Sequence, residues 1–236
     1  MADRQEVIDL LVKAVRQQDE LGLGGIRVAR ETVTMTTQMA KSAPAVPTSG
    51  SLSDFCEQIK NCTKCRLHQG RTKFVFGVGN PNADVMFVGE GPGRDEDLKG
   101  EPFVGRAGQL LDKILAAINF NRNQVYIANV VKCRPPSNRD PQPDEMAECL
   151  PYLKRQIELI NPKLICCLGR ISAQALLGVQ TPLGKMRQRW FDFGGRKLMV
   201  TYHPAALLRF PQYKRETWED VQMLRREYDA QLAQSQ

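Results

Sequence analysis

The sequence predicts an α/β fold, a three-layer sandwich around a central, mostly parallel sheet of four strands. Two observations support this fold class. Short apolar runs alternate with helical stretches after residue 53, which is typical of parallel sheets with crossover helices. The apolar runs are rich in Val, Ile and Leu without polar alternation, as expected for strands covered on both faces. A chain of 236 residues, 42% of them hydrophobic, can bury such a core without disulfides.

The first 52 residues are expected to lie outside the sheet domain. Residues 5–22 carry apolar side chains at helical spacing and predict an amphipathic helix that ends at a group of glycines. Residues 31–52 are rich in Thr, Ser and Pro, which predicts a disordered linker. The helix is either a binding element for a protein partner or a dispensable extension. The folded domain is predicted over residues 53–232.

Four strands and four helices are predicted in that domain. The strands cover residues 83–91, 124–131, 163–169 and 197–203, and the helices cover residues 107–118, 144–160, 171–177 and 213–232. Ligands of parallel sheets bind beyond the carboxyl ends of the strands. The residues that follow each strand are therefore the first candidates for a functional site.

Charge and hydropathy narrow the class of protein. No apolar run reaches roughly 18 residues, so no membrane span is expected, and the N-terminus does not resemble a secretory signal. We therefore expect a cytoplasmic protein and a monomer. The net charge is +7, and all of it falls after residue 52, because the first 52 residues contain six bases and six acids. A basic folded domain favours an anionic partner such as nucleic acid, which would associate the protein with the nucleoid.

Polar residues suited to a site follow three of the predicted strands. The first strand runs into a glycine-rich turn at residues 89–93, followed by a cluster of acids. Asn129 lies at the end of the second strand. His203, one of only two histidines, follows the last strand and is either a reactive group or a hydrogen-bonded turn residue.

Four of the seven cysteines form a candidate metal site. These are the C-x-x-C pair Cys62 and Cys65, followed far along the chain by Cys133 and Cys149. A cytoplasmic protein rarely keeps disulfides, and four thiolates suit either zinc or an iron–sulfur cluster. The wide spacing favours a cluster. Cys166 and Cys167 lie in a predicted strand and are expected in the core, and Cys56 is not expected to be a ligand.

Three motifs together resemble the family 4 uracil-DNA glycosylases, the iron–sulfur type of bacteria and archaea. The motifs are GEGPGRDEDLKGEPFVGRAGQLLD at 89–112, YIANVVKCRPPSNRDPQPDE at 126–145 and YHPAALLR at 202–209. The resemblance covers residues 53–228 and implies that the protein removes uracil from DNA and leaves an abasic site. It also implies a 4Fe–4S cluster on Cys62, Cys65, Cys133 and Cys149.

The resemblance further implies a uracil pocket made of Glu90, Gly91, Pro92, Phe103, Asn129 and His203. Because a stacked base is inaccessible, the nucleotide must be flipped into this pocket. Phe103 would stack on the base, and the amide of Asn129 would distinguish uracil from cytosine. His203 would stabilise the charge that develops on the leaving uracil. Glu90 is expected to orient the attacking water, with Glu96 as a second candidate.

DNA contacts are expected around the pocket. The resemblance implies that Leu207, Leu208 and Arg209 enter the minor groove, where apolar wedges fill the space of a flipped base. Basic residues near the pocket motifs are expected to contact phosphates. They are Lys185, Arg187, Arg134 and Arg139.

Three alternatives stay open at this stage. A glycosylase of family 5 would lack the acid at Glu90. A non-catalytic iron–sulfur DNA-binding module of replication or repair would need neither Asn129 nor His203. A zinc-ribbon interaction protein would hold a single metal ion instead of a cluster.

Overall fold

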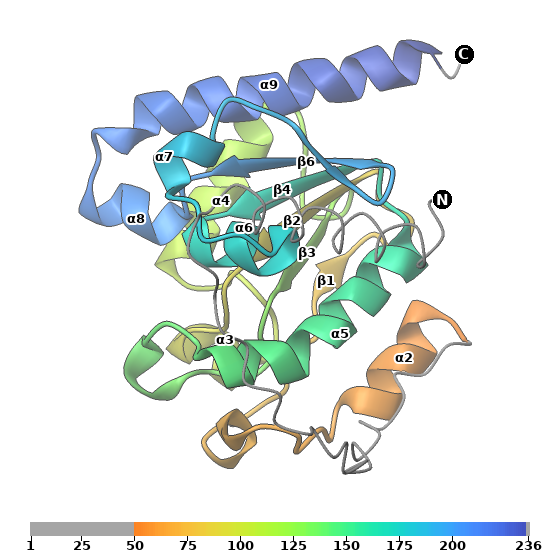
Figure 1. Cartoon of the computed structure of the whole chain (residues 1–236), viewed down its shortest axis with the longest axis vertical. Coiled ribbons are helices and arrows are strands. Elements are labelled where there is room, and N and C mark those ends of the chain that lie inside the picture. The colour runs from red at the N-terminus through yellow and green to blue at the C-terminus, as the bar shows by residue number, and fades with distance from the viewer. Residues whose placement is uncertain (1–49, 235–236) are drawn as a thin grey trace, which may run out of the picture. The chain divides into compact units, whose positions relative to one another are not determined.

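The fold was obtained as a computed structural model that describes residues 50–234. The predicted helix at 5–22 and nearly all of the linker at 31–52 lie outside the described residues. The predicted α/β fold class is confirmed, because a mostly parallel sheet lies between layers of helices (Figure 1). No helix among residues 50–234 is long and apolar enough to cross a membrane.

The sheet has six strands in the described residues, so the predicted number of four is wrong. The strands are β1 (Val78–Gly79), β2 (Val85–Gly89), β3 (Tyr126–Asn129), β4 (Leu164–Leu168), β5 (Phe191–Phe193) and β6 (Arg196–Thr201). Their order is β1-β3-β2-β4-β6-β5. The four predicted strands are the parallel ones in the centre, and β1 and β5 add antiparallel edges. The two edges are only two and three residues long and only partly buried, so they lack the continuous apolar run used to predict strands.

The four predicted helices are confirmed to within one or two residues. They are α4 (Arg106–Ala117), α5 (Pro143–Ile160), α6 (Arg170–Leu177) and α9 (Tyr213–Gln234). Four helices of at most eight residues were not predicted: α2 (Leu52–Ile59), α3 (Arg94–Lys99), α7 (Leu183–Met186) and α8 (Pro204–Arg209). Two single-turn 3-10 segments, Arg66–Gln69 and Pro136–Asn138, complete the chain. Short helices escape periodicity arguments because two turns contain too few apolar positions.

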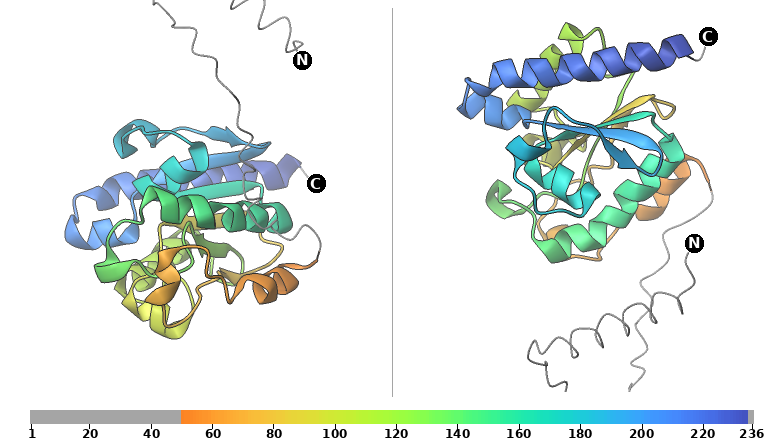
Figure 2. Two further views of the ribbon diagram at one scale, coloured as in Figure 1. Left: turned by 60° about the horizontal axis from the view of Figure 1, so that its bottom comes forward. Right: turned by 45° about the horizontal axis from the view of Figure 1, so that its top comes forward.

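Alternate residues of each central strand enter two separate cores. Val85 and Phe87 of β2 pack with α4 and α9, whereas Met86 and Val88 pack with α2 and α5. Figure 2 shows α9 along one face of the sheet and α5 beyond the opposite face. Cys166 and Cys167 are fully buried on opposite faces, in agreement with their predicted place in the core.

Strand register determines which residues meet at the carboxyl ends of the central strands. Gly89 at the end of β2 is paired with Asn129 at the end of β3, and Leu168 of β4 is paired with Thr201 of β6. These strands are parallel, so their carboxyl ends lie on one side of the sheet. The segments that follow them therefore converge there.

Candidate active site

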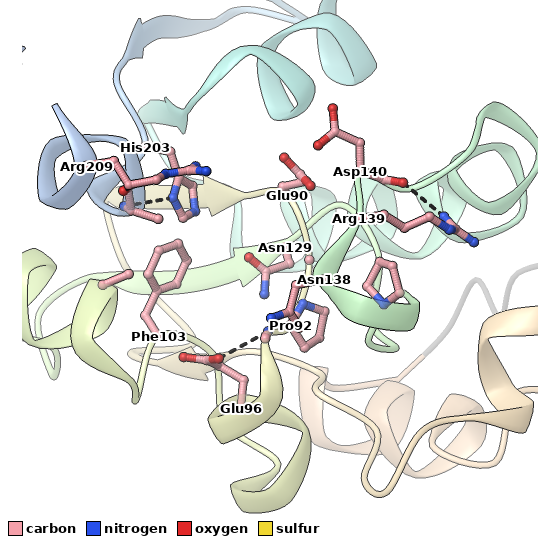
Figure 3. A pocket seen from close by; sticks show the side chains of 15 residues that line it. Glu90, Pro92, Glu96, Phe103, Asn129, Asn138, Arg139, Asp140, His203 and Arg209 are labelled. Atoms are coloured by element: carbon pink, nitrogen blue, oxygen red, sulfur yellow. Dashed lines mark hydrogen bonds between the residues drawn. The ribbon is translucent and has the colours of Figure 1, made fainter.

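A pocket of about 380 Å³ opens at the carboxyl ends of the parallel strands (Figure 3). It contains all six residues predicted to bind uracil, together with Glu96, Arg139 and Arg209. Its full lining is Glu90, Gly91, Pro92, Gly93, Glu96, Phe103, Ala107, Asn129, Pro135, Asn138, Arg139, Asp140, His203, Ala205 and Arg209. Segments far apart in the sequence thus meet at one cavity large enough for a small organic ring.

Asn129 presents an unsatisfied amide at the pocket wall. The residue is 2% exposed, and its Oδ1 is buried without a hydrogen-bond partner within residues 50–234. A Cβ at Gly89 would lie 2.4 Å from that oxygen and 2.6 Å from Cζ of Phe103, so glycine is required beside both groups. Because an unpaired buried acceptor costs about 1–3 kcal/mol, Asn129 is suited to a ligand that brings an N–H group.

Phe103 is held in a strained backbone conformation at the pocket. Its φ is 54°, in the left-handed region that a bulky residue rarely occupies. The guanidinium of Arg122 donates to the Phe103 carbonyl at 3.0 Å and to the Pro102 carbonyl at 2.7 Å. A Cβ at Gly108 would lie 1.8 Å from the Phe103 carbonyl oxygen. These contacts fix the ring 5.3 Å from the His203 ring, centroid to centroid.

Glu96 acts as a clamp between two loops. One carboxylate oxygen accepts hydrogen bonds from the backbone N–H groups of Val104 (2.9 Å) and Gly105 (3.0 Å). The other accepts from the N–H of Gly93 at 3.1 Å, which caps α3. Both oxygens are therefore engaged by the main chain. This placement favours a positioning role for Glu96, in contrast to the predicted role in orienting water.

His203 directs an N–H group towards the pocket. Its Nδ1 accepts a hydrogen bond from the backbone N–H of Ala205 at 3.1 Å, at the start of α8. A neutral imidazole with Nδ1 as acceptor carries its proton on Nε2. Burial, together with the nearby Arg209 cation, lowers the pKa of His203 to about 4. The side chain is thus a neutral hydrogen-bond donor at physiological pH.

Glu90 is drawn between Arg209 and Asp140 in Figure 3, in a charged environment. Burial first, and then the carboxylate of Asp140, raise the pKa of its carboxyl group to about 7. Arg170 and Arg209 act in the other direction. The group therefore changes charge near neutral pH, as suits a general base.

The four predicted cysteine ligands influence one another's ionisation. The pKa of Cys149 is raised to about 12, mainly by burial, with smaller contributions from Cys133 and Cys65. Cys62 in turn contributes to the raised pKa values of Cys65 and Cys133. The four thiols are therefore within electrostatic reach of one another. Cys133 and Cys149 are 6% and 8% exposed, and the other two are partly buried.

Hydrogen-bond donors surround these sulfurs. The backbone N–H of Lys132 donates to Sγ of Cys149 at 3.3 Å, and the Arg71 guanidinium donates to Sγ of Cys133 at 3.3 Å. Within residues 50–234, no three His, Cys, Asp or Glu side chains are close enough to hold a single metal ion. Four thiols with N–H donors at their sulfurs are chemically suited to hold an iron–sulfur cluster, whose cysteine sulfurs accept such hydrogen bonds.

Comparison with known proteins agrees with this geometry. The sequence profile of the uracil DNA glycosylase superfamily matches residues 76–222. A type-4 uracil-DNA glycosylase of Archaeoglobus fulgidus is 48% identical over 182 residues, which cover 74% of this chain and 92% of the relative. The chain belongs to the type-4 uracil-DNA glycosylase family. The predicted family is therefore confirmed.

Two further relatives bear on the alternatives. A type-4 uracil-DNA glycosylase of Thermotoga maritima is 46% identical over 170 residues, which cover 70% of this chain and 88% of the relative. A DNA polymerase of Bacillus phage SP01 is 33% identical over 159 residues, which cover 67% of this chain but only 17% of the polymerase. The type-4 relatives thus match over nearly their whole length, whereas in the polymerase the match is one small part.

The residues predicted to contact DNA fall into two groups. Arg139 and Arg209 line the pocket, Lys185 and Leu208 are exposed, and Arg134 donates to Oδ1 of Asn138 at 2.7 Å beside the pocket. Leu207 and Arg187 are placed differently from the prediction, as described next. Leu208 adjoins the pocket residue Arg209 in α8 of this type-4 family member.

Leu207 and Arg187 are occupied within the protein. Leu207 is 2% exposed because it forms the inner side of α8. The Arg187 side chain is 9% exposed and pairs with Asp220 at 2.7 Å and with Glu216. It also lies over the ring of Tyr202 at 4.8 Å. These contacts do not favour either side chain as a direct DNA contact.

Sequence reasoning missed two polar residues of the pocket. Asn138 and Asp140 both line it, and neither was predicted as a site residue. Asn138 has a φ of 54°, which turns the chain after a pair of prolines. The signal was present in the segment PPSNRD, where an Asn after Pro-Pro marks a turn that can aim a side chain.

Proposed function

We propose that the protein flips uracil out of DNA and hydrolyses its N-glycosidic bond, leaving an abasic site. The observation that carries this proposal is the unpaired Oδ1 of Asn129, which lies in one pocket with the Phe103 ring and His203. Each of these groups has a counterpart on a flipped uracil. The type-4 names of relatives that are 46–48% identical support the same reaction.

Base recognition rests on hydrogen-bond polarity. Asn129 Oδ1 accepts from uracil N3–H, and its NH₂ group donates to O4. Cytosine presents the reverse pattern at both positions, so it would leave polar atoms of the amide mispaired, at about 1–3 kcal/mol each. Phe103 provides a flat face for the base, and the rigid loop around it keeps the ring in place. The pocket therefore selects uracil before any bond is broken.

Bond cleavage requires stabilisation of the leaving base. The sugar gains positive charge while uracil departs as an anion with charge on O2. The Nε2–H of neutral His203 donates to this oxygen and costs little reorganisation because the ring is already held by Ala205. Glu90, when ionised, orients the water that attacks the sugar carbon and accepts its proton.

DNA is held by side chains around the pocket. Leu208 is 39% exposed and fills the space left by the flipped nucleotide. Arg134, Arg139, Lys185 and Arg209 supply phosphate contacts that do not depend on base sequence. We further propose that the enzyme acts as a monomer on chromosomal DNA in the cytoplasm. Residues 1–52 then provide a site for a protein partner outside the domain at 53–232.

Cys62, Cys65, Cys133 and Cys149 would hold a 4Fe–4S cluster. When bound, the cluster supplies a cross-link between segments that are far apart in the sequence, and no hydrolytic chemistry. The segment between Cys133 and Cys149 carries Asn138, Arg139 and Asp140, all of which line the pocket. The proposed role is therefore to order this part of the pocket and the adjoining DNA-binding surface.

The test is cleavage of a uracil-containing oligonucleotide by the wild type, Asn129→Asp and His203→Ala. Both variants are expected to lose most activity while binding uracil-free DNA as the wild type does. Full activity in both would refute the pocket assignment. The phage polymerase relative makes a non-catalytic DNA-binding module the second candidate, and tight binding by the wild type without cleavage would favour it.

A further inference from the structure

Lys132 is a buried charged residue that the reaction itself does not use. The residue is 0% exposed, one residue before Cys133. Its ammonium donates to the backbone carbonyl of Asn129 at 2.9 Å and to the side-chain oxygen of Gln156. Both acceptors are neutral. Burying an ammonium group with neutral partners is costly, so a specific role is needed to explain it.

The main chain of Lys132 contacts the four-cysteine group. Its backbone N–H donates to Sγ of Cys149 at 3.3 Å. The same residue therefore touches a proposed cluster ligand through its main chain and the base-reading residue Asn129 through its side chain. These two contacts form a continuous path from the cysteines to the uracil pocket.

Helix α5 contacts Lys132 at two points. It carries both Cys149 and Gln156, and Gln156 is itself 0% exposed. The amide nitrogen of Gln156 donates to the carbonyl of Phe76 at 2.9 Å, so its oxygen is oriented towards the Lys132 ammonium. A shift of α5 at Cys149 would consequently move both the Cys149 sulfur and the Gln156 oxygen, which accept hydrogen bonds from Lys132.

We propose that Lys132 is a positioning residue that couples the four-cysteine centre to uracil recognition. Cysteine ligation fixes the main chain of Lys132, and its ammonium then holds the carbonyl of Asn129 at the end of β3. The Asn129 amide is thereby kept aimed into the pocket. This inference rests on the proposed function, because it assigns regulation to the same base-binding site.

The first test compares Lys132→Met with the matched control Lys163→Met. Methionine keeps the apolar length of the side chain and removes its donors. Lys163 is a surface lysine that pairs with Asp84 at 3.1 Å, away from the pocket lining. We expect inhibition by free uracil to weaken about tenfold in Lys132→Met, as for one lost charged hydrogen bond. Iron content, visible absorbance and affinity for uracil-free DNA should match the wild type and the control.

A double-mutant cycle tests whether Lys132 acts through Asn129. In an Asn129→Ala background, Lys132→Met should change uracil affinity less than about twofold, because the amide is already gone. Additive losses would overturn the inference. If Asn129→Ala alone leaves uracil affinity intact, the proposed function fails. If it weakens affinity while Lys132→Met behaves as the wild type, only the present inference fails.

Hydrogen exchange on the wild-type holoprotein provides a test that does not depend on a folded variant. The N–H groups of Val130 and Val131 bond to the carbonyls of Gly89 and Glu90. Removal of iron by a chelator is expected to speed exchange in residues 129–132 more than in β6. If chelation speeds exchange in residues 129–132 no more than in β6, the coupling is contradicted.

Discussion

Replacement of Glu90 by glutamine tests how burial tunes the pocket. The pKa of Glu90 is raised from 4.5 to about 7, first by burial and then by Asp140, while Arg170 and Arg209 oppose the rise. In the unfolded chain the group ionises near its ordinary value. At about 1.4 kcal/mol per pH unit, the ionised carboxylate costs the folded state about 3 kcal/mol above pH 7.

The sign of this effect is opposite to that of a typical paired carboxylate. Because the folded pKa is the higher one, the folded state binds more protons between pH 4.5 and about 7. Stability therefore falls as pH rises through this window. Glu90→Gln removes the cost, so its stability advantage over the wild type should grow by most of about 3 kcal/mol as the pH rises from 5 to 8. Urea unfolding of both proteins at several pH values measures this difference.

Activity should respond in the reverse direction. The single-turnover rate of the wild type is expected to rise with pH through about 7, because only ionised Glu90 accepts a proton from water. Glu90→Gln should be slower and flat across the same range. His203, with a pKa of about 4, adds no second limb between pH 5 and 8. Equal pH dependence of stability and rate in both proteins would refute the assignment of burial and charge to Glu90.

Three further predictions concern neighbouring residues. Leu207→Ala should lower the free energy of unfolding in urea by about 2–5 kcal/mol, since Leu207 is 2% exposed. Leu208→Ala should change this free energy by no more than about 0.5 kcal/mol. It should slow cleavage of a duplex substrate more than cleavage of a single-stranded one. Arg187→Met leaves Asp220 buried without its cation and should lower the free energy of unfolding by about 3–5 kcal/mol. The salt dependence of DNA binding should stay unchanged, and a smaller salt dependence in the variant would show that Arg187 contacts a phosphate. Arg122→Met removes two hydrogen bonds from the loop of the stacking ring and should weaken uracil inhibition more than binding of uracil-free DNA, and equal losses of both would indicate general unfolding.

The central architecture could be predicted from the sequence because its signals are local. Val85–Gly89 and Leu164–Leu168 are continuous apolar runs, and burial on both faces of a parallel sheet requires such runs. The edge strands Val78–Gly79 and Phe191–Phe193 were missed because they are short and half exposed. Their pairing depends on neighbours that only the folded sheet supplies.

The candidate site shows the same division at the level of single side chains. Three motifs indicated Asn129, Phe103 and His203, and strand register brought them to one pocket. Glu96 looked like a reactive acid in the sequence, yet its oxygens are engaged by backbone N–H groups from two loops. The basic stretch at Arg187 likewise gave no sign of its distant partners.

The family, the parallel sheet and the residue types at the strand ends could be inferred from the amino-acid sequence, since these follow from motif order, periodicity and composition. Which charges are available to a substrate depends on the folded structure. Arg187 meets Asp220 from a segment 33 residues away, and Lys132 meets Gln156 from one 24 residues away. A charged side chain serves the fold or the reaction according to what surrounds it, and those surroundings come from parts of the chain that no local pattern connects.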